Sequence, residues 1–167
     1  MIKNEFNSVR LYARNENGRY QRATREQILT AARSEIDCLF SRESALLESP
    51  EMVKDWLRTR LAPYTKEIFG VLWMDNRHRA ISFIEYSHGT IDSATVSPRE
   101  LVRGAIETNA AACVLAHNHP SGVAKPSQAD KLITTKAKEA LELVGTRTLD
   151  HIIVADDTFS FAEHRMI

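Results

Sequence analysis

Apolar residues recur every three or four positions in four segments of the chain, which is the spacing of amphipathic helices. These segments predict helices from residue 24 to about residue 46, from 49 to 63, from 97 to about 109, and from 127 to 145. Each predicted helix begins at a serine or a threonine, residues that cap a first turn by accepting a backbone hydrogen bond. Pro50 and Pro98 follow their caps directly, where proline fits the first helical position.

Shorter apolar runs lie between the predicted helices, and their length favours strands. They occupy residues 68–74, 80–86, 111–116, 149–154 and 158–161. The first two flank a turn-forming stretch and predict a hairpin, and Gly89 then marks a break before residues 90–96. Because strands alternate with helices, the sequence predicts an α/β protein with a sheet flanked by helices. The first 20 residues are polar and lack a period, so we expect an arm there.

Composition and charge exclude several classes of protein. The 167 residues suffice for one domain with its own core. Twenty-two basic and 22 acidic residues give a net charge of zero, so we expect no strong autonomous binding to nucleic acid. Cys38 and Cys113 have apolar neighbours and are predicted to be buried free thiols. No apolar run is long enough for a signal peptide or a membrane span, and we expect a soluble, cytoplasmic protein.

Two histidines and an aspartate carry the clearest chemical signal. His117 and His119 stand two apart at a strand end, so their side chains point to the same side. Asp130 lies one turn into the following helix and can turn toward them. Two imidazoles and a carboxylate suit Zn²⁺ and leave its fourth position open for water, as in catalytic sites, although other divalent ions accept the same ligands. Ser127 and Asp130 also have the spacing of a capping box, which Asp130 could serve instead.

The stretch HNHPSGVAKPSQAD at residues 117–130 resembles the JAMM pattern H-x-H-P-x6-S-x-x-D of the JAB/MPN metalloproteases. The preceding HGTIDSATVSPRELVRGAI and the following LDHIIVADDTFSFAEH are similar to bacterial RadC-type JAB domains. The resemblance implies a three-layer, cytidine deaminase-like fold with a mixed sheet between helices. It places a RadC-type JAB/MPN domain at residues 48–167, after an N-terminal arm and helix at residues 1–47. Residues 1–47 do not resemble the helix-hairpin-helix-like region of full-length RadC proteins, which indicates the shorter RadC type.

The resemblance also implies roles for five residues. It implies that His117, His119 and Asp130 hold Zn²⁺, that Glu67 is the general base, and that Ser127 helps hold the oxyanion. Glu85 is an alternative base, although strand alternation places it on the face opposite Ile84 and Tyr86. His151 follows Asp150 in a predicted strand and is either a group that supports the metal ligands or a structural histidine.

The resemblance implies a zinc-dependent hydrolase of peptide or isopeptide amide bonds, in which Glu67 takes the proton of the attacking water, and the chemistry of these residues agrees with it. The partner would be a protein or peptide substrate, with no membrane involved. The alternative is an accessory zinc-binding protein of DNA repair or maintenance, in which zinc is structural or catalysis is vestigial. The complete set of ligands together with Glu67 favours the enzyme, because a binding module has no chemical need for the glutamate.

Overall fold

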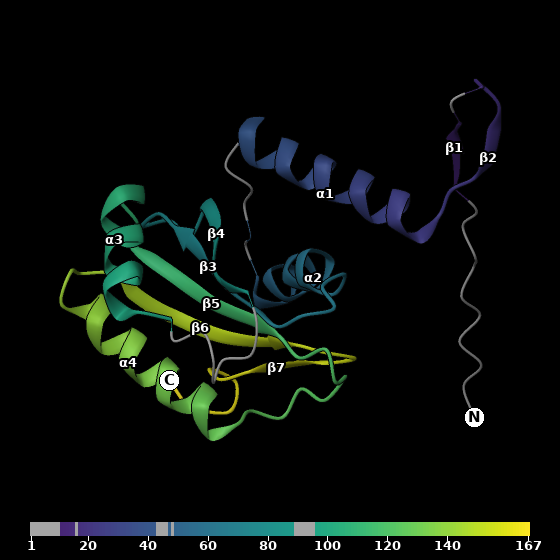
Figure 1. The fold of residues 1–167 in the computed structure, drawn as a ribbon. Coiled ribbons are helices and arrows are strands. Elements are labelled where there is room, and N and C mark those ends of the chain that lie inside the picture. The colour runs from purple at the N-terminus through teal and green to yellow at the C-terminus, as the bar shows by residue number, and fades with distance from the viewer. Residues whose placement is uncertain (1–10, 16, 43–46, 48, 89–95) are drawn as a thin grey trace.

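The computed structural model describes residues 11–15, 17–42, 47, 49–88 and 96–167, with only the backbone of 35–42 and 88 (Figure 1). The helices are α1 (Arg25–Arg42), α2 (Pro50–Leu61), α3 (Pro98–Thr108) and α4 (Gln128–Glu142). The strands are β1 (Tyr12–Arg14), β2 (Tyr20–Arg22), β3 (Ile68–Met74), β4 (Ala80–His88), β5 (Ala112–Asn118), β6 (Arg147–Val154) and β7 (Thr158–Ser160). The break predicted at Gly89 and the predicted end of the first helix, at 43–46, lie outside the described residues.

A mixed sheet of five strands, in the order β4-β3-β5-β6-β7, forms the centre of the molecule. β5 and β6 run parallel, and the other neighbouring strands are antiparallel. Every residue of β3 and of β5 is buried, because helices cover both faces of the sheet. The predicted α/β class with a mixed sheet between helices is confirmed.

Alternation along the strands sorts the core into two layers, one on each face of the sheet. Helix α2 packs Trp56, Leu57 and Leu61 against one face, together with Leu72 of β3. Helices α3 and α4 cover the other face, where Trp73 of β3 belongs to the core. Figure 1 shows α2 on one side of the sheet and the α3–α4 pair on the other. The face of α3 and α4 is the one that carries the candidate site.

The N-terminal part differs from the predicted arm. β1 and β2 pair in an antiparallel hairpin that extends away from the sheet beyond α1 (Figure 1). Five of its six strand residues are exposed, and only Ala13 is half-buried, so no apolar period could reveal it. The predicted capping box of α1 is present, because Gln27 N donates to Thr24 Oγ1 and Thr24 N donates to Gln27 Oε1.

The serine caps differ from one another. Ser49 and Ser127 accept hydrogen bonds from backbone N–H groups in the first turns of α2 and α4, as predicted. Ser97 stands at the N-cap of α3, but its side chain makes no capping bond. That helix start relies on Pro98 and on the Ser97 carbonyl, which accepts from Glu100 N at 2.9 Å.

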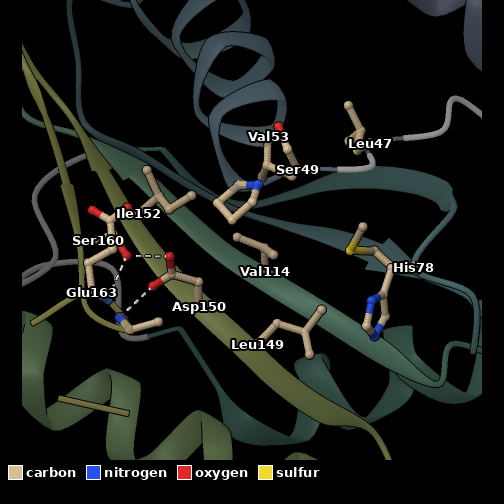
Figure 2. A pocket seen from close by; sticks show the side chains of 13 residues that line it. Leu47, Ser49, Val53, His78, Val114, Leu149, Asp150, Ile152, Ser160 and Glu163 are labelled. Atoms are coloured by element: carbon tan, nitrogen blue, oxygen red, sulfur yellow. Dashed lines mark hydrogen bonds between the residues drawn. The ribbon is translucent and has the colours of Figure 1, made fainter. Parts of the chain in front are cut away.

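A small cavity of about 220 Å³ lies between α2 and the sheet (Figure 2). Val53, Val114 and Ile152 are among its apolar lining residues. Asp150 lies at its edge and accepts from Ser160 Oγ at 2.5 Å and from Ala162 N at 2.9 Å. The cavity is on the α2 face, away from the histidines of the candidate site.

Two further expectations concern single groups and segments. Cys113 is a buried free thiol, as predicted, and burial raises its pKa to about 12. The side chain of Cys38 lies outside the described residues. Among the helices of the described part, none is both long and apolar enough to cross a membrane.

Candidate metal centre

Glu67, His117, His119 and Asp130 come together at one edge of the sheet. Each offers one ligand atom, and these atoms all lie within 4.8 Å of one another. His117 Nε2 lies 3.0 Å from His119 Nε2 and 3.2 Å from Asp130 Oδ1. His119 Nε2 lies 3.6 Å from Asp130 Oδ2. The structure thus brings together the four residues that the sequence singles out for metal and water.

Strand β5 is longer than predicted, and this extension places the histidines. The apolar run ends at Ala116, but the strand continues through His117 and Asn118, which pair with Ile153 and Val154 of β6. His117 also pairs with Phe69 of β3, so its side chain shares a face with that ring. The loop starts only at His119, whose N–H still donates to Val154 O at 2.8 Å.

Asn118 lies between the two histidines in sequence and fixes the segment that carries Glu67. Its Oδ1 accepts from Ile68 N at 2.7 Å. Its Nδ2 donates to Lys66 O at 3.0 Å and to Tyr64 O at 3.3 Å. The buried amide therefore binds the backbone on both sides of Glu67. Alternation could have placed Asn118 on the face opposite the histidines, but no local pattern indicated its backbone partners.

Asp130 serves the helix and the centre at the same time. Its Oδ2 accepts from Ser127 N at 2.6 Å, and Ser127 Oγ accepts from Asp130 N at 3.1 Å, which completes the capping box. The other oxygen, Oδ1, is buried and has no hydrogen-bond partner among the described residues. The two interpretations of Asp130 that the sequence left open are therefore both compatible with its geometry.

The residues fit a divalent cation. His119 Nδ1 lies 2.7 Å from Val123 O, and a carbonyl oxygen only accepts, so the proton is on Nδ1. A neutral His119 then presents a bare Nε2 toward Asp130. The unpartnered Asp130 Oδ1 and the two nearby imidazole nitrogens converge on one point, and a buried lone pair without a donor is costly. Two imidazoles and a carboxylate are ligands that Zn²⁺ accepts.

The pKa shifts of His117 and Asp130 favour the protonation states that a metal ion requires. Burial lowers the pKa of His117, which keeps the ring neutral. Burial alone would raise the pKa of Asp130, but the neighbouring His117 and His119 rings and the Ser127 N–H hold it well below its usual value. Contact with Asp130 raises the pKa of His119, so in the metal-free protein a proton competes for this ring. An ionised carboxylate and a neutral His117 are the forms that bind metals.

Glu85, the alternative base, is not part of this group. Phe83, two residues earlier on the same face of β4, packs against the core under α2. Ile84 and Tyr86 pack against the core on the other face. Glu85 Oε1 accepts from Tyr64 Oη at 2.8 Å. Its carboxylate is therefore held on the α2 side of the sheet, as alternation predicted.

Two buried side chains lie behind the histidines. His151 is fully buried, and its Nε2 lies 2.8 Å from His117 Nδ1. Thr134 of α4 contacts His151 Nδ1 through its hydroxyl. The sequence had suggested either a supporting or a structural role for His151, and Thr134 was missed. The only available signal was the position of Thr134, one helical turn after Asp130.

A family model and several curated proteins match this chain, and they agree on one family. The RadC-like JAB domain matches residues 47–166. A UPF0758 protein of Thioalkalivibrio sulfidiphilus is 47% identical over 142 residues, which are 85% of this chain and 63% of that protein. A UPF0758 protein of Nitrosococcus oceani is 53% identical over 123 residues, 73% of this chain and 55% of that protein. The chain therefore spans less than two thirds of these relatives. A UPF0758 protein of Vibrio cholerae is 46% identical over 143 residues, 86% of this chain and 90% of that protein.

Proposed function

The chain belongs to the RadC-like JAB domain family, and on that basis we propose that it is a zinc-dependent hydrolase of peptide or isopeptide bonds. The observation that carries the proposal is the convergence of Glu67, His117, His119 and Asp130 within 4.8 Å. A structural zinc site is usually closed by four protein ligands, of which Cys is the commonest. Here the fourth residue is a glutamate, which suits proton transfer.

In this proposal His117, His119 and Asp130 hold the ion. A zinc ion bound there supplies a Lewis acid and lowers the pKa of water to about 7. The protein contributes the geometry, because Asp130 is fixed by the capping box and His119 by Val123 O. Asn118 holds the backbone on both sides of Glu67, so this carboxylate is presented to the site from a rigid segment.

Glu67 is the proposed general base and then the general acid. Its carboxylate would accept a proton from the attacking water and give it to the departing amine. Ser127 Oγ already accepts from Asp130 N, and its own hydrogen is left to donate. That hydrogen is the proposed donor to the oxyanion of the tetrahedral intermediate.

The decisive experiment joins metal analysis to an unbiased search for cleavage. The purified chain should contain about one zinc, and incubation with peptide and isopeptide libraries should release new amino termini, read by mass spectrometry. His117→Ala and His119→Ala should each lose the metal while the core still folds. Stoichiometric zinc in both variants would contradict the assigned ligands.

Two glutamate variants test the chemistry on any substrate found. Glu67→Gln should keep zinc and lose most turnover, because general acid–base catalysis contributes about 10²–10⁴-fold. Glu85→Gln is the matched control, since it removes the same charge on the other face of the sheet, and turnover should stay within a few-fold. A larger loss of turnover in Glu85→Gln than in Glu67→Gln, at equal zinc content, would show that Glu67 is not the base. Zinc binding without any cleavage would favour the accessory zinc protein instead.

A further inference from the structure

We propose that Thr134 and His151 are positioning residues that hold His117 in the tautomer able to bind metal. The proposal rests on the metal centre proposed above, and it is independent of whether the centre hydrolyses amides. Three hydrogen bonds in series, each between buried groups, connect the backbone of α4 to His117. The direction of each bond follows from the one before it.

The series begins at a group that can only accept. Thr134 Oγ1 lies 2.5 Å from Asp130 O, and a carbonyl oxygen has no hydrogen to give. The Thr134 hydroxyl hydrogen must therefore lie on this line, since two bare oxygens at that distance would repel. Thr134 has no second hydrogen on its oxygen, so toward His151 it can only accept.

His151 is then fixed as well. Its Nδ1 lies 2.6 Å from Thr134 Oγ1, so Nδ1 carries the hydrogen. The ring is completely buried against the aromatic rings of Phe161 and Phe69, where a neutral imidazole with a single N–H is the form that fits. Nε2 is therefore a bare acceptor, and it lies 2.8 Å from His117 Nδ1.

His117 completes the series. It donates from Nδ1 to His151, and a neutral imidazole with its hydrogen on Nδ1 has a bare Nε2. That is the atom that lies 3.2 Å from Asp130 Oδ1, in the metal centre. The series therefore begins and ends at the same residue. The Asp130 carbonyl accepts from Thr134 at one end, and the Asp130 carboxylate lies beside His117 Nε2 at the other.

Aromatic rings enclose His151, and the polar neighbours of His117 Nε2 are the other residues of the metal centre, His119 and Asp130. His151 stacks on Phe161, with ring centroids 4.8 Å apart, and meets the edge of Phe69 at 5.8 Å. Both histidines are completely buried, so water does not compete for their nitrogens. A reversed series would put the hydrogen on His117 Nε2 and block its lone pair, and only the Thr134–Asp130 bond excludes that direction.

Nitrogen-15 NMR of the histidine rings in the metal-free protein tests the tautomers directly, because a protonated and a bare ring nitrogen differ strongly in chemical shift. His117 and His151 should both carry their hydrogen on Nδ1. Single replacements of other histidines assign the signals. Observation of His117 with its hydrogen on Nε2 would overturn the proposal without reference to metal or activity.

Variants at Thr134 test the consequence. Thr134→Val keeps the shape and removes the hydroxyl, so zinc affinity, measured by competition with a chromophoric chelator, should fall about 10–100-fold. Thr134→Ser restores the hydroxyl and should bind zinc within a few-fold of the parent. Thr135→Val is the matched control, since the exposed Thr135 makes the same bond to a carbonyl one turn back, at 3.0 Å, away from the centre.

The outcomes separate the two proposals. If the parent chain binds no zinc, the metal centre fails, whereas the NMR result still decides the tautomers. If the parent binds zinc and Thr134→Val binds it equally well, the centre stands and the positioning role is wrong. Thermal unfolding of the metal-free variants shows whether Thr134→Val loses zinc affinity only because it is less well folded. In that case Thr134→Ser and Thr134→Val would differ in unfolding temperature, but His117 would have the same tautomer in both.

Discussion

At the scale of single residues, Asn118 satisfies three backbone groups around Glu67 with one side chain. Asn118→Leu should therefore lower the free energy of unfolding of the metal-free protein by about 2–4 kcal/mol, because buried polar groups lose their partners. Asn118→Asp keeps the acceptor for Ile68 N but turns a buried carboxylate oxygen toward the carbonyls of Lys66 and Tyr64, so its loss should be at least as large. Denaturant unfolding measures both, and a Leu variant as stable as the parent would contradict this role.

A second residue-scale prediction concerns acid. The pKa of His151 is lowered in the folded state by burial, so below about pH 6.5 the unfolded chain binds a proton that the folded chain refuses. Stability from this group is complete above that pH and is lost as the pH falls, by up to about 1.4 kcal/mol per pH unit. His151→Gln removes the group, so between pH 6.5 and 5 the metal-free variant should lose stability less steeply than the parent. Parallel slopes in denaturant unfolding would refute this.

At the scale of elements, three serines at helix starts form a natural series. Ser49→Ala and Ser127→Ala should each lower the free energy of unfolding by about 1 kcal/mol, since each hydroxyl caps its helix. Ser97→Ala should cost much less, because that side chain makes no capping bond. Only Ser127→Ala should also reduce turnover. A turnover loss in Ser49→Ala of equal size would mean that the Ser127 effect reports helix stability and not chemistry.

The packing of α3 on β4 leaves room for no side chain at Gly104. An added Cβ would stand 1.9 Å from Tyr86 Oη and 3.0 Å from Trp73 Cζ2. Gly104→Ala should therefore lower the free energy of unfolding by about 1–3 kcal/mol, although alanine itself favours helix. Adding Tyr86→Phe removes the nearest atom and should recover part of the loss. A double variant no more stable than the single one would place the clash elsewhere.

How far the sequence predicts the structure differs between elements. Runs buried on both faces, such as 68–74, were predicted with their observed bounds, because burial leaves a continuous apolar signature. The end of β5 was missed because its last two residues, His117 and Asn118, are polar yet buried. The hairpin of β1 and β2 was missed because its pairing uses backbone groups and exposes its side chains.

In the candidate site, too, some features could be predicted from the sequence and others could not. Ligand types and spacing are properties of the sequence and pointed to His117, His119 and Asp130, whereas Glu67 followed from the resemblance to the JAMM pattern. The partners of Asn118 lie 50 or more residues away along the chain, and those of Thr134 and His151 depend on how α4 lies on β6. Contacts across such separations leave no local pattern, so only the structure reveals what supports the site.

At the scale of the whole molecule, we expect the N-terminal hairpin to be separable from the centre. Its strand residues are mostly exposed, and the family match begins only at residue 47. Deletion of residues 1–20 should leave zinc affinity unchanged and shift the unfolding temperature little, as measured by calorimetry and chelator competition. A large drop in unfolding temperature would show that this segment packs on the domain.

The bonds that hold Asp130, His119 and His117 all run to other protein groups, and this has a consequence for the exchange of the ion. In zinc-finger peptides the ion brings its ligands together, and its departure unfolds the chain. Here the backbone amide of Ser127, the carbonyl of Val123 and the ring of His151 orient the ligands by themselves. Loss and uptake of the proposed ion would then be local events within a folded protein, so a stripped chain should reload at a rate set by diffusion and water displacement, with no refolding phase.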